Sequence, residues 1–140
     1  MKFRCEREVL AEALGAASRA TTGRSGSLPV LAGIRLEVKG NKLSITGSNI
    51  ELTVQQELQV GGGADGGTVL PARLATDIVK SLGAPQVDVT ADAEAVEISA
   101  GRSRFSIRPL AFDDYPRMGT PAGSAVTMPA SAFVEALKQV

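Results

Sequence analysis

Apolar and polar side chains alternate along much of the chain. In Ile34–Val38 the apolar side chains alternate with charged ones, and Leu43–Thr46 repeats the alternation with hydroxyl side chains. The pair Gly40-Asn41, which favours a tight turn, stands between the two segments. Residues 34–46 are therefore predicted to form a β-hairpin with one buried face.

The same alternation predicts further strands on both sides of the centre of the chain. Every second position from residue 50 to residue 60 is apolar except Gln56, and these positions are Ile50, Leu52, Val54, Leu58 and Val60. This pattern predicts a long, half-buried strand. Three more strands are predicted around alternating pairs: Val87 and Val89, Val96 and Ile98, and Phe105 and Ile107.

Two segments follow the spacing of a helix instead. Apolar residues recur every three or four positions in residues 7–19 and again in residues 72–82, which predicts two amphipathic helices. Gly83 and Pro85 are expected to end the second helix. The glycine-rich tract 61–67 is interpreted as a flexible connector. It lacks the Gly-Lys-Ser/Thr ending of a phosphate-binding loop.

A strand followed by a helix recurs along the chain. Short strands are expected at Lys2–Glu6, Thr68–Leu70 and Val126–Met128, each directly before a helix, and the last two junctions share the pair Pro-Ala. Units of about 1–60 and 67–110 are predicted to pair into one two-layer α+β domain. Its two helices are expected to lie side by side against curved antiparallel sheet.

The end of the chain begins a third such unit. Ser131–Val140 is predicted to start a helix whose apolar face nothing in the chain covers. The expected division is therefore a domain in residues 1–120, then a linker with the first strand and helix of a second domain in residues 121–140. On this interpretation the 140 residues are part of a longer chain.

Composition removes several classes of function. The sequence has one Cys and no His, which excludes a disulfide framework, a multi-cysteine metal site and any His-based catalytic triad. It shows neither a signal peptide nor an apolar stretch of membrane-spanning length, so a cytoplasmic protein is expected. Fifteen basic residues balance fifteen acidic ones. Nucleic-acid binding would therefore need cations gathered on one surface.

The remaining candidate groups for chemistry are few. Asp113-Asp114 precedes Tyr115-Pro116 and is interpreted as a structural turn, because adjacent carboxylates seldom converge on one cation. Cys5 has the parity of Phe3 and is interpreted as a small buried hydrophobe. No cofactor and no bound metal are expected.

Basic side chains mark two surfaces. Strand geometry puts Arg102, Arg104 and Arg108 on one face of a strand and Phe105 and Ile107 on the other. This pattern fits either an edge strand protected from aggregation or an edge that pairs with an acidic, apolar partner. If the two helices lie side by side, they create a basic face with the cations Arg19, Arg24, Arg73 and Lys80.

Several motifs, in order and over the whole chain, closely resemble the bacterial β sliding clamp family, the processivity subunit of replicative DNA polymerase III. The segments that carry the resemblance are Met1-Lys2-Phe3, Glu6-Arg7-Glu8, Leu28-Pro29-Val30-Leu31, Leu43-Ser44-Ile45-Thr46-Gly47, Pro71-Ala72-Arg73 and Gly101-Arg102-Ser103-Arg104-Phe105-Ser106.

The resemblance implies a non-catalytic, ring-shaped homodimer of three similar domains per subunit, with helices lining a hole for double-stranded DNA. It also implies that polymerase and clamp loader bind a pocket between the second and third domains, outside this chain. The residues it assigns to DNA binding are Arg24, Arg73, Lys80 and Arg19. The residues it assigns to the dimer interface are Leu74, Arg102, Arg104, Phe105 and Ile107.

Two alternatives stay open at this point. One is a duplicated clamp paralogue that acts as a decoy, an assembly part or a drug-resistance protein. The other is a carboxylate–metal hydrolase that uses Asp113, Asp114 and a third acid.

Overall fold

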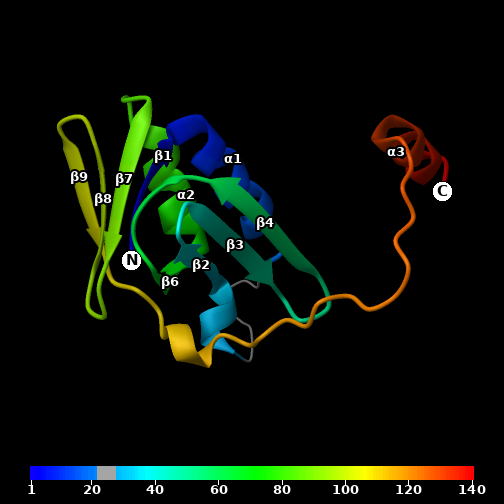
Figure 1. The fold of residues 1–140 in the computed structure, drawn as a ribbon, viewed down its shortest axis with the longest axis horizontal. Helices are drawn as coiled ribbons and strands as arrows, with labels where there is room; N and C mark the ends of the chain where they lie inside the picture. Colours follow the sequence, from blue (N-terminus) through cyan, green and yellow to red (C-terminus); the bar gives the residue numbers. More distant parts are fainter. Residues whose placement is uncertain (22–27) are drawn as a thin grey trace.

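The computed structural model describes residues 1–21 and 28–140. Two antiparallel sheets and a pair of helices form the body of the molecule (Figure 1). The five-stranded sheet has the order β5 (Gly61–Ala64), β1 (Lys2–Glu6), β7 (Gln86–Ala91), β8 (Val96–Ala100) and β9 (Ser103–Ile107). The four-stranded sheet has the order β4 (Thr53–Gln59), β3 (Lys42–Ser48), β2 (Gly33–Lys39) and β6 (Gly66–Pro71). The α+β architecture predicted from the alternation is confirmed.

The two repeated units exchange their first strands. β1 begins the first unit but pairs with β7 of the second, and β6 begins the second unit but pairs with β2 of the first. Each sheet therefore contains strands of both units, which ties the halves together more firmly than packing of two separate sheets would. The hairpin predicted in residues 34–46 is confirmed, with Leu36 opposite Ile45.

Both predicted helices form and lie side by side (Figure 1). They are α1 (Arg7–Ser18) and α2 (Ala72–Ser81). The amide of Arg7, at the start of α1, donates to the carbonyl oxygen of Pro85, just beyond the end of α2, over 2.8 Å. The start of one helix thus meets the end of the other, so the two run in opposite directions.

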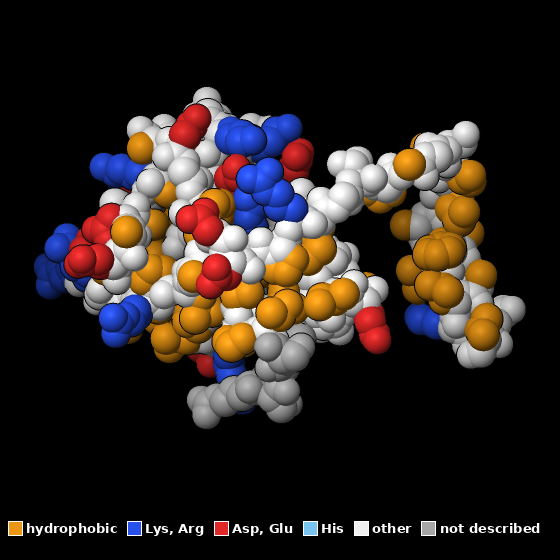
Figure 2. Space-filling model, turned by 90° about the horizontal axis from the view of Figure 1, so that it is seen from below, with side chains coloured by type: hydrophobic (Ala, Val, Ile, Leu, Met, Phe, Trp, Pro, Cys, Tyr) orange, Lys and Arg blue, Asp and Glu red, His pale blue; other side chains and the backbone are white. Residues whose placement is uncertain are grey.

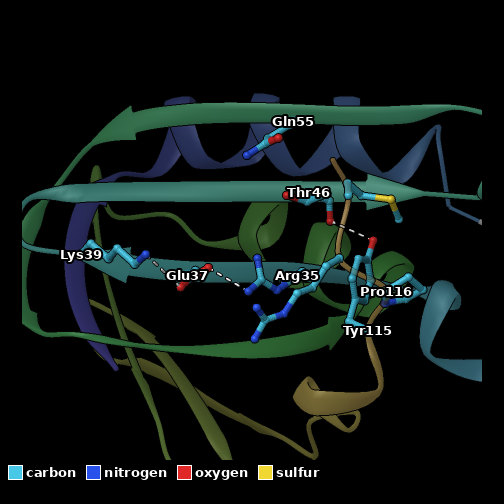
Figure 3. Close-up of a pocket in the computed structure, with 9 residues that line it drawn as sticks. Arg35, Glu37, Lys39, Thr46, Gln55, Tyr115 and Pro116 are labelled. Atoms are coloured by element: carbon cyan, nitrogen blue, oxygen red, sulfur yellow. Dashed lines mark hydrogen bonds and ion pairs between the residues drawn. The ribbon is translucent and has the colours of Figure 1, made fainter. Parts of the chain in front are cut away.

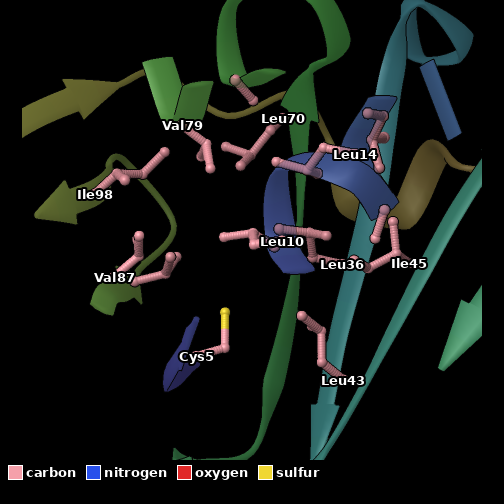
Figure 4. Packing of buried hydrophobic residues seen from close by; sticks show 14 of the residues in the cluster. Cys5, Leu10, Leu14, Leu36, Leu43, Ile45, Leu70, Val79, Val87 and Ile98 are labelled. Carbon is pink, nitrogen blue, oxygen red and sulfur yellow. The ribbon is translucent and has the colours of Figure 1, made fainter. Parts of the chain in front are cut away.

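The apolar faces of both sheets and both helices meet in one core. Leu10 and Leu14 of α1 lie among side chains of both sheets, with Leu36 and Ile45 nearby and Val87 and Ile98 farther across (Figure 4). Gln56, the one polar interruption in its strand pattern, donates through Nε2 to the carbonyl oxygen of Ala13 over 3.0 Å. That bond satisfies a polar group next to the core.

The long strand predicted from residue 50 starts later than expected. β4 begins at Thr53, and Ile50 and Leu52 are exposed in a turn. Ile50 has a φ of 79°, in the left-handed region, and its amide donates to Oγ of Ser48 over 3.0 Å. Side-chain hydrogen bonds of this turn replace the strand ladder there, which alternation of apolar residues does not reveal.

The interpretation of residues 61–67 as a flexible connector is wrong. Gly61–Ala64 is strand β5 and pairs with β1, and β6 begins at Gly66. The amide of Gly62 donates to Oδ1 of Asn41 over 3.1 Å. The glycines leave room for close approach of the turn between β2 and β3, so their lack of side chains serves packing here.

Residues 109–118 cross the outer face of the four-stranded sheet and cover a second, smaller core. Its buried residues are Val30, Leu31, Val69 and Tyr115. Leu110 forms a bridge with Val69, and Tyr115 donates its hydroxyl to the carbonyl oxygen of Thr46 over 3.3 Å. Two short 3₁₀ turns border this core, η1 (Pro29–Ala32) and η2 (Phe112–Asp114).

The helix predicted after residue 130 is present as α3 (Ala130–Lys138), which stands away from the body (Figure 1). The prediction of a strand at Val126–Met128 is wrong. Residues 121–129 are exposed and pair with none of the described strands, and a strand needs a neighbour to satisfy its backbone groups. Within the described residues, none of the helices has the length and apolar character needed to cross a membrane.

Candidate functional site

The exposed side of the helix pair carries cations. Arg73 lies in the first turn of α2 and Lys80 in the last, seven residues apart and therefore on one face. Arg19 is exposed at the end of α1. Because the helices run in opposite directions, Arg19 and Arg73 belong to the same end of the pair. Arg24 lies outside the described residues.

These cations are not neutralised by neighbouring acids. Within the described part of the chain, no carboxylate oxygen lies within 4.0 Å of the charged groups of Arg19, Arg73 or Lys80. Asp77 shares the exposed face of α2 but forms no ion pair of that length with any residue that the structure describes. The exposed side of the helix pair also carries Glu8, Glu12 and Asp77. The cations among them can still contact anions such as phosphates weakly, because no carboxylate of the described chain pairs with them directly.

β9 lies at the edge of the five-stranded sheet, as expected from its arginines. It pairs with β8 on one side, with Phe105 opposite Ile98. Phe105 is 38% exposed, which is unusual for a phenyl ring. Arg104 lies 3.4 Å from Glu97, so its charge is partly balanced within the sheet.

The other residues assigned to a subunit interface differ in exposure. Arg102 is exposed in the turn before β9, and Leu74 is 49% exposed on α2, one turn before the half-buried Ile78. Ile107 is only 4% exposed and belongs to the main core. It supports the strand from within, and its side chain adds nothing to the surface.

The two candidates for chemistry behave as structural residues. Asp113 and Asp114 lie in η2, which confirms the predicted turn. Among the described residues no group of three or more His, Cys, Asp or Glu is arranged to hold a metal ion. Cys5 is buried, as predicted, and burial raises the pKa of its thiol to about 11, so the thiol stays protonated at neutral pH.

Sequence reasoning missed a charged pocket on the outer face of the four-stranded sheet (Figure 3). β2 contributes Arg35, Glu37 and Lys39, and the segment after η2 contributes Arg117. The alternation in β2 predicted that Arg35 and Glu37 face away from the core. It gave no signal that Arg117, far along the chain, lines the same pocket.

Comparison with known proteins shows which family this chain resembles. Residues 1–119 match the family model described as DNA polymerase III beta subunit, N-terminal domain. The chain is 31% identical to the beta sliding clamp of Streptomyces coelicolor over 140 residues, all of this chain and 37% of that protein. It is 29% identical to the beta sliding clamp homolog GriR of Streptomyces muensis, again over the whole chain and 37% of the relative.

Solved structures of β subunits share the fold of this chain. The crystal structure of the DNA polymerase III subunit beta from Pseudomonas aeruginosa superposes with a TM-score of 0.88 at 30% identity, covering 99% of this chain and 38% of that one. The 140 residues thus span well under half the length of the relatives they match.

Proposed function

This chain belongs to the DNA polymerase III β-subunit family, and on that premise we propose that it is the first part of a sliding clamp. Such a clamp is a non-catalytic ring that encircles duplex DNA and tethers the replicative polymerase to it. The observation that carries the proposal is the helix pair α1 and α2, whose exposed face bears the cations Arg73 and Lys80 without carboxylate partners in the described chain.

A neutral protein with a few cations on one face suits sliding. Phosphate contacts are the same for every DNA sequence, and a small number of them holds the duplex without fixing the protein at one position. A strongly basic surface would slow movement along the duplex. In this proposal Arg24, Arg73, Lys80 and Arg19 face the DNA and contact phosphates only.

The proposed domain division follows the repeat. Residues 1–120 form the first domain, and residues 121–140 form a linker and the beginning of a second domain of the same fold. The family model that ends at residue 119 supports this boundary, and so does the similar start of α2 and α3, each directly after a Pro residue.

We propose β9 as the edge that meets a second subunit. An unpaired strand edge offers backbone hydrogen bonds to a neighbouring strand, and the exposed Phe105 offers an apolar anchor. In this proposal Leu74 adds a further apolar contact, and Arg102 and Arg104 supply two cations for an acidic partner surface. Ile107 contributes from the core by holding β9 in place.

Polymerase and clamp loader are the further proposed partners, in a cytoplasmic replication complex. In this family their binding pocket lies between the second and third domains, which residues 1–120 do not include. We therefore expect residues 1–140 alone neither to recruit these partners nor to close a ring.

The experiment that tests the proposal is clamp loading onto circular DNA by the complete subunit. Arg24→Ala together with Arg73→Ala should reduce loading, and the slope of log K against log salt concentration should fall by about 2, one for each lost phosphate contact. Lys2→Ala with Lys42→Ala removes the same charge from exposed positions on the strands and should load normally. Equal behaviour of the two double variants contradicts the proposed DNA face.

A second clamp copy with a separate role is the other candidate. The observation in its favour is that similarity to the homolog GriR, at 29% identity, nearly equals similarity to a beta sliding clamp at 31%. Replacement of the replicative clamp by this protein in cells separates the two. Support of chromosome replication favours the replicative clamp, and failure with normal folding favours the separate role.

A further inference from the structure

The pocket on the outer face of the four-stranded sheet is an open depression of about 350 Å³. Its floor is the sheet itself, with Arg35, Glu37 and Lys39 on β2 and Gln55 on β4, and one wall is the segment that contains Arg117 (Figure 3). Lys and Arg side chains also gather in the space-filling view near the place where the chain leaves the body toward α3 (Figure 2).

The charges that line this pocket do not balance. Glu37 is its one carboxylate, and it lies 2.8 Å from Arg35 and 3.7 Å from Lys39. Arg117, the third cation, is exposed and has no carboxylate within 4.0 Å among the residues that the structure describes. The pocket therefore has a surplus of positive charge, which attracts an anionic group.

Arg35 is held in place before any ligand arrives. Its guanidinium lies over the ring of Phe112, 4.7 Å from the ring centre. The segment that carries Phe112 is fixed in turn by the hydrogen bond from Tyr115 to the carbonyl oxygen of Thr46. A guanidinium has five N–H donors, so the bond to Glu37 leaves donors free for a second carboxylate.

The position of the pocket separates it from the helix pair. Leu36 and Val38 point from β2 into the core beside the helices, whereas Arg35, Glu37 and Lys39 occupy the alternate positions on the opposite face. A negative charge within the pocket disfavours a row of phosphates. A single carboxylate reaching Arg117 and the free edge of Arg35 meets less of that repulsion, because it brings one negative charge instead of several.

We propose that this pocket binds acidic side chains, Asp or Glu, on a peptide segment of a partner protein. The match is one of charge and shape: a shallow, polar depression with two guanidinium groups suits carboxylates presented from another surface. This interaction lies on the face opposite the helices, and it stands whether or not the helix pair faces DNA.

The test is a fluorescence anisotropy titration of the protein with a labelled peptide of about ten residues that contains four Glu. A matched peptide has Gln at those four positions. At low ionic strength the Glu peptide should bind at least about tenfold more tightly than the Gln peptide, and added salt should weaken it. Absence of measurable binding by the Glu peptide, or equal binding of both peptides, overturns the proposal.

Variants locate the binding. Arg117→Gln should lower the affinity for the Glu peptide about fivefold or more. Arg108→Gln removes the same charge from an exposed position after β9 and should change this affinity less than about twofold. Arg35→Lys keeps the charge but not the fork of donors and should also weaken binding. Equal losses in Arg117→Gln and Arg108→Gln overturn the assignment. So does stronger displacement of the peptide by a single-stranded oligonucleotide than by unlabelled Glu peptide.

Discussion

Gly62 and Gly40 lie so close together that a Cβ on Gly62 would come within 1.8 Å of the carbonyl oxygen of Gly40. Gly40 is the turn residue between β2 and β3, with a φ of 59°, and Gly62 belongs to β5 of the other sheet. The two sheets therefore meet at a point where only hydrogen atoms fit. Asp65 reinforces the contact, since its Oδ1 accepts a hydrogen bond from the amide of Gly40 over 2.8 Å.

Gly62→Ala should lower the free energy of unfolding by about 2–3 kcal/mol, because the new methyl group meets backbone that cannot move aside cheaply. Chemical denaturation measures the change. Gly83→Ala is the matched control, since a Cβ there meets nothing within 4 Å, and it should change stability by less than about 0.5 kcal/mol. Equal effects of the two substitutions would show that close packing at Gly62 is unimportant.

Ile50→Asn should raise the free energy of unfolding by about 1 kcal/mol. The left-handed backbone at φ 79° is strained for a β-branched residue, whereas Asn adopts that conformation readily. Because the Ile50 side chain is 62% exposed, its replacement removes little buried apolar area. Leu52→Asn replaces a neighbouring side chain of similar exposure outside the left-handed region, so it should leave stability nearly unchanged. A stabilisation that is the same at both positions would point to surface polarity as its cause.

Stability should fall between pH 9 and pH 11 through Cys5. Burial raises the pKa of the thiol from 9.0 to about 11, so the unfolded chain loses this proton at lower pH than the folded one. The stabilisation is complete below pH 9 and is lost as the pH rises through the folded value, in total about 3 kcal/mol. Denaturation of wild type and Cys5→Ala across this range isolates the effect, because other groups titrate equally in both. A constant difference between the two proteins contradicts it.

Phe105→Ala combined with Arg104→Glu should weaken dimerisation of the complete subunit. Without the ring, a pocket on the partner subunit stays unfilled, and the new carboxylate repels acidic groups of that subunit. Each change should cost about 2 kcal/mol or more of binding free energy. Sedimentation at nanomolar concentration should show monomers. Leu28→Ala with Lys2→Glu makes matched changes at exposed positions outside β9 and should leave the dimer intact.

The elements themselves could be predicted because their signals are local. The hairpin of β2 and β3 follows from alternation and a Gly-Asn turn, and α1 and α2 follow from apolar spacing. The edge position of β9 was suggested by its arginines. In each case the signal reflects which side of one element is buried, a property that neighbouring residues along the chain share.

The sequence by itself therefore determined the hairpin of β2 and β3, the helices α1 and α2, the repeat of two units and the cations on the helices and β9. Only the tertiary structure decided which strand pairs with which: that β1 joins β7, that the glycine tract is strand β5, and that Ile107 is buried while Phe105 is exposed. It also brought Arg117 to Arg35. These outcomes depend on space and charge contributed by residues far apart in the chain, and such contacts exist only once the sheets and helices have packed together.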